Sequence, residues 1–250
     1  MRTTLLLSFT FLTVLLPRME ASTQDAPCIA GTLLSYESNQ GGCELGGANG
    51  GILVFSGFTF SSTSSGSPVI LDASEITVTP DPQGLGGGFI FGGFTGAPVL
   101  AGQTAQYDID YSYFIDAGPV SSGADIGMDP PFGNVSIIEA ICADSIFVQA
   151  TGAGPQCEIP DDPFAPQILS VDDTNPPTSL SAHLDLKPIV TSFANIQTTI
   201  SLNGGSSGAG FDSLTATSTV VDPTPEPLTL LTALGGLLVI GLLRRRSECG

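Results

Sequence analysis

Positive charge and tryptophan are scarce in this sequence of 250 residues. It contains six Lys and Arg against 24 Asp and Glu, one His and no Trp. Five of the six basic residues lie near the two ends, so residues 22–225 contain 21 acidic residues and only Lys187, a formal net charge of −20. Nucleic-acid binding requires clusters of Lys or Arg that neutralise phosphates. The sequence therefore excludes nucleic acid as a partner.

The groups that enzymes use most often are also scarce. His183 is the only imidazole, and strand alternation places it on the same face as Ser181 and Asp185. The segment Gly204–Gly208 matches G-x-S-x-G in letters, but it lies in a Gly/Ser stretch with no helix after it, unlike the strand-to-helix turn of a serine hydrolase. Neither G-x-x-x-x-G-K nor G-x-G-x-x-G occurs. We expect a non-enzymatic protein with no catalytic residue and no cofactor.

Long hydrophobic runs occur only at the two ends. Arg2 precedes an apolar run from Leu5 to Leu16, which is followed by Pro17 and by small residues at Ala21 and Ser22. This order is typical of a secretory signal peptide, and the run is too short to span a bilayer. The sequence predicts a signal peptide over residues 1–21 and hence an exported protein.

The second apolar run, Leu228 to Leu243, contains no charge and is followed by Arg244, Arg245 and Arg246. At about 1.5 Å per residue it would be about 24 Å long, slightly shorter than a hydrocarbon core of about 30 Å. The positive-inside rule keeps the arginines cytoplasmic and leaves the bulk of the chain outside. We predict a single-pass membrane protein with its N-terminal domain outside. A glycolipid-anchor signal is the alternative, although such tails usually end in the apolar run itself.

Pro225, Glu226 and Pro227, followed by this helix and the arginine run, resemble the bacterial PEP-CTERM sorting signal over residues 225–250. The resemblance implies export by the Sec machinery and processing near Pro-Glu-Pro by a membrane-embedded exosortase. It also implies that the protein reaches the cell surface or the exterior of a bacterium that makes extracellular polysaccharide. Residues 218–224 are expected to form the linker before this signal.

Five cysteines are present, and four of them, Cys28, Cys43, Cys142 and Cys157, lie in the predicted exported part. Export places these four in an oxidising compartment, where two disulfides are expected. Three connectivities are open, and we favour Cys28 with Cys43 and Cys142 with Cys157 because 14 residues separate the members of each pair. Zinc ligation is disfavoured because zinc ligands come in closer pairs supported by His.

Alternation with a period of two dominates residues 22–217. Gln106–Tyr113 and Ser179–Leu186 alternate apolar and polar side chains, as half-buried strands do. Shorter candidate strands are Ile52–Phe60, Glu75–Thr79, Gly88–Phe94, Asn134–Cys142, Ser145–Ala150, Ile196–Leu202 and Leu214–Val221. Many short strands separated by Gly, Pro and Ser turns, without a helical period, predict an all-β ectodomain. We expect an antiparallel β-sandwich.

Carboxylates are the one abundant functional group. Asp108 and Asp110 share a strand face, while the pairs Asp161-Asp162 and Asp172-Asp173 fall in expected loops. Loop carboxylates can bind Ca²⁺, but no calcium-loop motif is present, so we predict a solvated acidic surface and no metal site. The main hypothesis is an exported, non-enzymatic surface or extracellular-matrix protein, with extracellular polysaccharide as a candidate partner. A Ca²⁺-dependent carbohydrate-binding or adhesion module is the alternative, and a secreted hydrolase is the least favoured.

Overall fold

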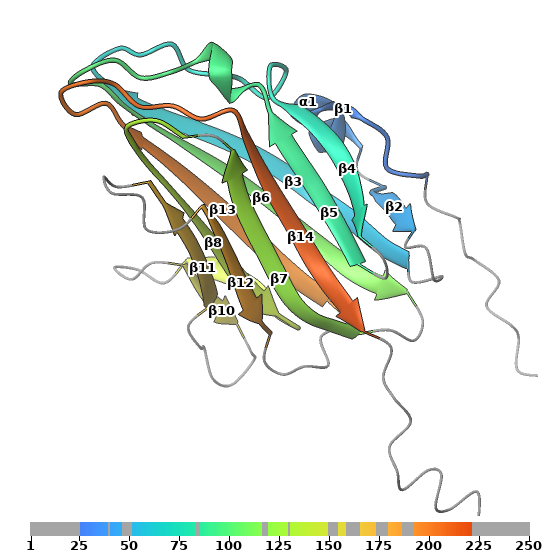
Figure 1. Cartoon of the computed structure of the whole chain (residues 1–250). Coiled ribbons are helices and arrows are strands. Elements are labelled where there is room, and N and C mark those ends of the chain that lie inside the picture. The colour runs from blue at the N-terminus through green and yellow to red at the C-terminus, as the bar shows by residue number, and fades with distance from the viewer. Residues whose placement is uncertain are drawn as a thin grey trace, which may run out of the picture.

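The computed structural model describes residues 26–39, 41–46, 52–83, 86–116, 120–129, 131–149, 155–158, 166–173, 180–186 and 193–221. Within these ranges the chain is almost entirely antiparallel β-structure, and two six-stranded sheets pack against each other (Figure 1). The predicted β-sandwich is therefore confirmed in its architecture. The proposed signal peptide, the Pro-Glu-Pro motif, the apolar run 228–243 and the arginine run lie outside the described residues.

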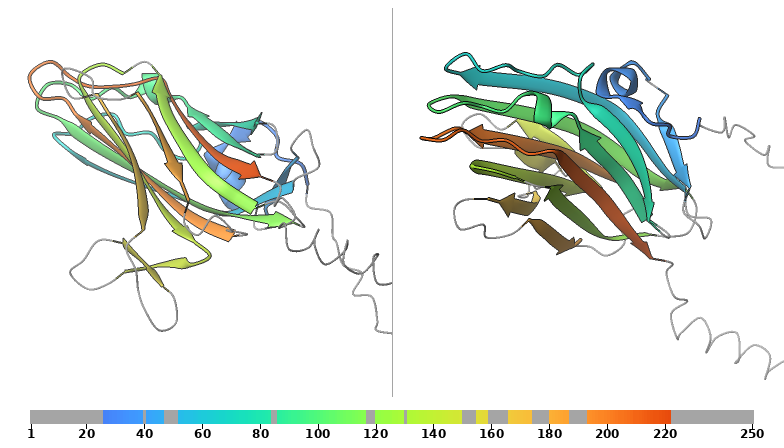
Figure 2. Two further views of the ribbon diagram at one scale, coloured as in Figure 1. Left: turned by 60° about the horizontal axis from the view of Figure 1, so that its bottom comes forward. Right: turned by 45° about the horizontal axis from the view of Figure 1, so that its top comes forward.

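The two sheets are named here sheet A and sheet B. Sheet A has the order β11 (Gln167–Asp172), β8 (Asn134–Ala143), β13 (Phe193–Asn203), β6 (Thr104–Asp116), β3 (Ile52–Ser65) and β2 (Cys43–Gly46). Sheet B has the order β1 (Gly31–Thr32), β4 (Thr77–Gln83), β5 (Gly86–Gly92), β14 (Ser213–Val221), β7 (Val120–Asp129) and β12 (Ser181–Asp185). Figure 2 shows the same two layers from two further directions.

Three small elements complete the described fold. A hairpin of β9 (Ile146–Gln149) and β10 (Pro155–Glu158) follows β8. The helix α1 (Leu33–Ser38) begins at Thr32, whose side chain accepts a hydrogen bond from the Ser35 backbone amide in a capping box. A single turn of 3-10 helix, η1 (Phe94–Gly96), follows β5.

The core between the sheets is rich in aromatic side chains. Tyr107, Tyr111 and Tyr113 lie on the inner face of β6 and are buried, as their alternation predicts. Tyr111 stacks on Phe58 with ring centroids 5.4 Å apart, and Phe55 meets Phe89 of sheet B edge to face at 4.7 Å. Such pairs add about 0.5–1.5 kcal/mol beyond the burial of their area. The Phe55–Phe89 pair joins the two sheets, whereas Phe58 and Tyr111 both belong to sheet A.

Several strands differ from the sequence expectation. β3 continues through the serines to Ser65, and β4 continues through Pro80 to Gln83. Pro80 is tolerated because β1 pairs with only the first two residues of β4, so the edge beside Pro80 needs no amide donor. β7, the short strands β1, β2, β10 and β11, and the helix α1 were not predicted.

The C-terminal strand also extends beyond the expected ectodomain. β14 runs to Val221, so residues 218–221, expected to start the linker, are part of a strand that pairs with β7. In the part of the chain that the structure describes, no helix has the length and apolar character needed to cross a bilayer.

Both expected disulfides are present. Cys28 bonds to Cys43 and Cys142 to Cys157, with Cα–Cα distances of 4.8 and 5.4 Å. The first bond ties the N-terminal segment to β2, and the second ties the β9–β10 hairpin to β8. Disulfides of this kind persist in oxidising compartments, so they support an exported protein.

Candidate functional site

The outward surface of β3, β6 and β13 in sheet A is lined mainly by uncharged polar and acidic side chains, and we call this surface the polar face. It consists of Thr59, Ser61 and Thr63 on β3, Gln106, Asp108, Asp110 and Ser112 on β6, and Asn195, Gln197, Thr199 and Ser201 on β13. The strands place these residues in register across the sheet, so that Thr59, Asp110 and Gln197 form one row. Ser61, Asp108 and Thr199 form the next row. The face is therefore a two-dimensional array of hydrogen-bonding groups.

Asp108 and Asp110 accept hydrogen bonds within this array. The Thr199 hydroxyl donates to Asp108 Oδ1 at 2.8 Å, and the Gln106 amide donates to both oxygens of Asp108 at 3.1 and 3.0 Å. The Thr59 hydroxyl donates to Asp110 Oδ2 at 3.3 Å, while Asp110 Oδ1 is buried without a hydrogen-bond partner. Burial raises the pKa of Asp110, outweighing the nearby Gln197 amide and Thr59 hydroxyl, which lower it.

An aromatic pair borders one end of the polar face. Phe114 of β6 is 41% exposed and lies directly across from Phe193, the half-buried first residue of β13. The next outward residues on these strands are Ser112 and Asn195. An exposed aromatic ring next to polar groups is the usual combination for binding an amphipathic ligand. The four tyrosines cannot supply this surface because all are buried.

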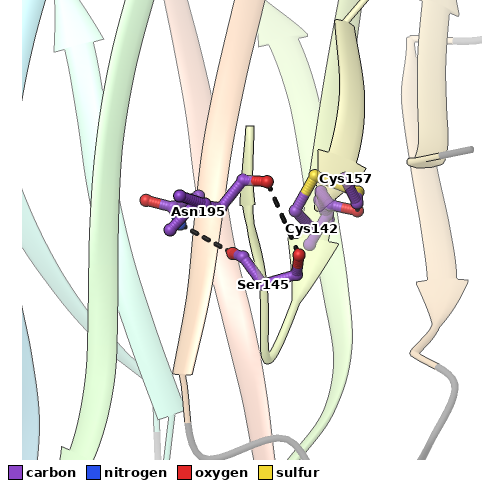
Figure 3. The surroundings of a disulfide bond; sticks show 6 residues. Cys142, Ser145, Cys157 and Asn195 are labelled. Carbon is purple, nitrogen blue, oxygen red and sulfur yellow. Dashed lines mark hydrogen bonds between the residues drawn. A yellow bond between two sulfur atoms is a disulfide. The ribbon is translucent and has the colours of Figure 1, made fainter. Parts of the chain in front are cut away.

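The β9–β10 hairpin lies against sheet A beside the same end of the polar face. Cys142 is the outward residue of β8 opposite Asn195, and its disulfide to Cys157 holds the hairpin at that row (Figure 3). The Asn195 side-chain amide donates to the Ser145 carbonyl at 2.7 Å, just before the hairpin begins. The disulfide therefore fixes a wall next to the polar and aromatic residues.

A polar pocket of about 360 Å³ lies at the opposite end of the face. Asn203 and Asn134 pair at the ends of β13 and β8, and both line this pocket with Asp173, Ser206 and Ser207. The backbone of the loop 204–208 and Gly133 form the rest of the lining.

Two glycines let the walls of the pocket come close together. Gly133 has φ +77°, and a Cβ at this position would lie 2.1 Å from the Gly208 carbonyl oxygen. A Cβ on Gly204 would lie 1.9 Å from the Leu100 carbonyl oxygen. Contacts this short are forbidden, so only glycine permits these close approaches.

The residues considered for serine-hydrolase chemistry lie apart in the fold. Ser206 belongs to the pocket loop after β13 of sheet A, whereas His183 lies on the outward face of β12 in sheet B. Both His183 ring nitrogens contact carboxylates, Nδ1 at 2.7 Å from Asp125 and Nε2 at 3.2 Å from Asp185. These hydrogen bonds, the one to Asp125 first, raise the pKa of His183.

His183 and Asp185 share a face, as expected, and the contact of His183 with Asp125 could not be predicted because β7 was not. The imidazole is 53% exposed and links the edge strand β12 to β7, so this arrangement has a structural explanation. The geometry brings no serine hydroxyl of the pocket loop to this imidazole.

No metal centre is found among the described residues, where no group of three or more His, Cys, Asp and Glu side chains is placed to bind an ion. Asp108 and Asp110 lie on adjacent outward positions of β6, and Asp172 and Asp173 lie at the end of β11. Asp161 and Asp162 lie outside the described residues.

Comparison with known proteins adds little to this description. No family model and no curated protein matches the chain. Among solved structures, TmCBM61 in complex with β-1,4-galactotriose is 11% identical, with a TM-score of 0.30, covering 64% of this chain and 86% of its own. A family 11 carbohydrate-binding module from Clostridium thermocellum, in complex with a β-1,3-1,4-mixed-linked tetrasaccharide, is also 11% identical, with a TM-score of 0.24 and coverage of 64% and 87%. At these TM-scores the likeness carries no conclusion about function.

Proposed function

We propose that this protein is an exported, non-catalytic module of the bacterial surface that binds neutral polysaccharide on its polar face. The observation that supports this proposal is the ordered array of hydroxyl, amide and carboxylate groups next to Phe114 and Phe193. Sugar hydroxyls both donate and accept hydrogen bonds, so they match such a mixed array. The less polar faces of sugar rings match an exposed aromatic ring.

The charge of the protein selects among ligands of this kind. The formal net charge of the whole chain is −18, and Asp108 and Asp110 lie within the polar face itself. Such a surface repels polyanions, including acidic polysaccharides, whereas a neutral glycan meets no such repulsion. Calcium is not part of the proposal because the described residues offer no metal cluster.

Replacement of Phe114 by Ala tests this proposal. We expect Phe114→Ala to weaken binding to a neutral glycan about tenfold or more, because buried aromatic contacts dominate binding surfaces. Binding is measured by titration calorimetry after a screen of neutral glucan, galactan and mannan oligosaccharides. Leu180→Ala is the matched control, since Leu180 is 44% exposed and its backbone pairs at the far edge of sheet B. Absence of binding to all three glycan classes would overturn the proposal.

Sorting through the C-terminal signal is a second part of the proposal. It is supported by the order of Pro225, Glu226 and Pro227, the apolar run 228–243 and the arginines 244–246. Exosortase processing near Pro-Glu-Pro would place the β-sandwich among the extracellular polysaccharide that the polar face is proposed to bind.

The sorting signal is tested by expressing Glu226→Ala in a host that contains an exosortase. We expect the unprocessed form to accumulate in the membrane fraction, because the acidic residue at the centre of the motif is lost. Immunoblotting of membrane and extracellular fractions measures the change, and Glu37→Ala on α1 of the ectodomain serves as the control. Identical processing of wild type and Glu226→Ala would contradict the assignment.

A further inference from the structure

The polar pocket at the end of the polar face is continuous with it through the pair Asn203 and Asn134. Asn203 follows Ser201 by two residues on β13, so it is the next outward side chain along that strand. A glycan chain lying along β13 would therefore extend toward the pocket. Gly133 and Gly208, whose backbones approach closely, both line the pocket.

The chemistry of the pocket lining suits a neutral, hydroxyl-rich group. Ser206 and Ser207 each offer a hydroxyl that donates and accepts, and Asn134 offers an amide with both functions. Within the described residues these three side chains make no hydrogen bond, and all three are exposed. The Asn203 side-chain oxygen Oδ1 accepts a hydrogen bond from the Gly205 backbone amide at 3.1 Å, so the side-chain NH₂ group is left to donate. Donors and acceptors are therefore both available to a ligand.

Ions fit the pocket less well than a sugar unit. Among the described residues, Asp173 is the only carboxylate of the lining, fewer than the several oxygen ligands with which proteins usually surround Ca²⁺. The same carboxylate opposes an anion, and none of the described lining residues is a Lys, Arg or His that would attract one. Its volume of about 360 Å³ lies near the lower end of the range for small-molecule sites, about 300–1,000 Å³, so it suits a short group.

We propose that this pocket binds the terminal unit of a neutral glycan whose following units lie along the polar face. The inference rests on the function proposed above and adds that recognition is directed at chain ends. Each glycan chain then offers a fixed number of binding sites regardless of its length. If the polar face bound internal units alone, a longer glycan chain would bind more protein molecules.

The experiment uses the full-length protein and neutral glucan, galactan and mannan oligosaccharides in short and long forms of the same linkage. Calorimetry on the glycan that binds should give the same number of protein molecules per chain for both lengths. Ser206→Phe, which fills the pocket from an exposed loop position, should weaken binding about tenfold or more. Ser38→Phe is the control, because Ser38 is exposed on α1 and its hydroxyl bonds only the Leu34 carbonyl.

The outcomes separate the two proposals. Binding that increases in proportion to chain length, or that Ser206→Phe leaves unchanged, overturns the chain-end inference while the glycan-binding function stands. Failure of all three glycan classes to bind overturns the function and the inference together. Circular dichroism of Ser206→Phe confirms that the variant is folded, and Ser206→Ala, which removes only the hydroxyl, should give a smaller loss in the same direction.

Discussion

The free energy of unfolding is expected to fall as the pH rises from about 4.5 to about 8, because Glu139 is protonated in the folded protein. Glu139 lies on the inner face of β8 and is 1% exposed. Its neighbours across the sheet are Leu169 and Thr198, and the Thr198 hydroxyl donates a hydrogen bond to Glu139 Oε2 at 3.4 Å. Burial raises the pKa of Glu139 from 4.5 to about 8, outweighing this hydrogen bond.

The direction of this pH dependence follows from the number of protons bound in the folded and the unfolded state. Between the two pKa values the folded protein keeps a proton that the unfolded chain has released, so each unit of pH favours unfolding by about 1.4 kcal/mol. Over the whole interval the free energy of unfolding falls by about 5 kcal/mol. Below pH 4.5 both states are protonated, and the contribution no longer changes.

Glu139→Gln removes this titration while keeping a hydrogen-bonding group beside Thr198. We expect this variant to lose most of the falling slope and to be more stable than wild type at pH 8 by several kcal/mol. The free energy of unfolding is measured by urea unfolding at a series of pH values, with the fluorescence of the four buried tyrosines as the signal. Glu37→Gln on α1 is the control and should keep the slope. A wild-type stability that stays constant or increases from pH 5 to 8 would show that Glu139 is ionised in the fold.

The sequence predicted strands best where one face is apolar and the other polar. Tyr107, Tyr111 and Tyr113 alternate with polar residues on β6, and the structure buries them. β7 alternates as well, with Ala124, Ile126 and Met128 buried, but it was missed because the glycines and aspartates between them individually favour turns. Its place beside β14 comes from pairing with strands distant in sequence, information that a local pattern lacks.

The candidate site was predictable only in part for the same reason. Alternation placed Asp108 and Asp110 on one face of a strand, and the structure agrees. The partner of Asp108, Thr199, is 91 residues away and reaches it only because β13 lies next to β6. The pocket joins still more distant segments, so residue spacing alone could not reveal it. Phe114 was missed because it follows the alternating segment, although its outward position continues the same period of two.

Removal of either disulfide is the change expected to have the second largest effect. Both bonds join residues 15 apart, and the chain-entropy model gives about 3 kcal/mol for a loop of this length. Cys28→Ala/Cys43→Ala and Cys142→Ala/Cys157→Ala should therefore each lower the free energy of unfolding by a similar amount. The midpoint of urea unfolding should fall by about 1–2 M in each case. The control is the wild-type protein with its disulfides verified by mass spectrometry.

Removal of the two disulfides should have different local effects, because each bond holds a different part of the fold. Cys142–Cys157 ties the β9–β10 hairpin to β8 next to Asn195, whereas Cys28–Cys43 ties the N-terminal segment to β2. Hydrogen exchange at β9 should therefore accelerate only when Cys142 and Cys157 are replaced. Glycan binding near Phe114 should weaken in the same variant, since the wall beside that end of the polar face is released. Equal exchange at β9 in both variants would show that the hairpin is held by its other contacts, such as the Asn195–Ser145 hydrogen bond.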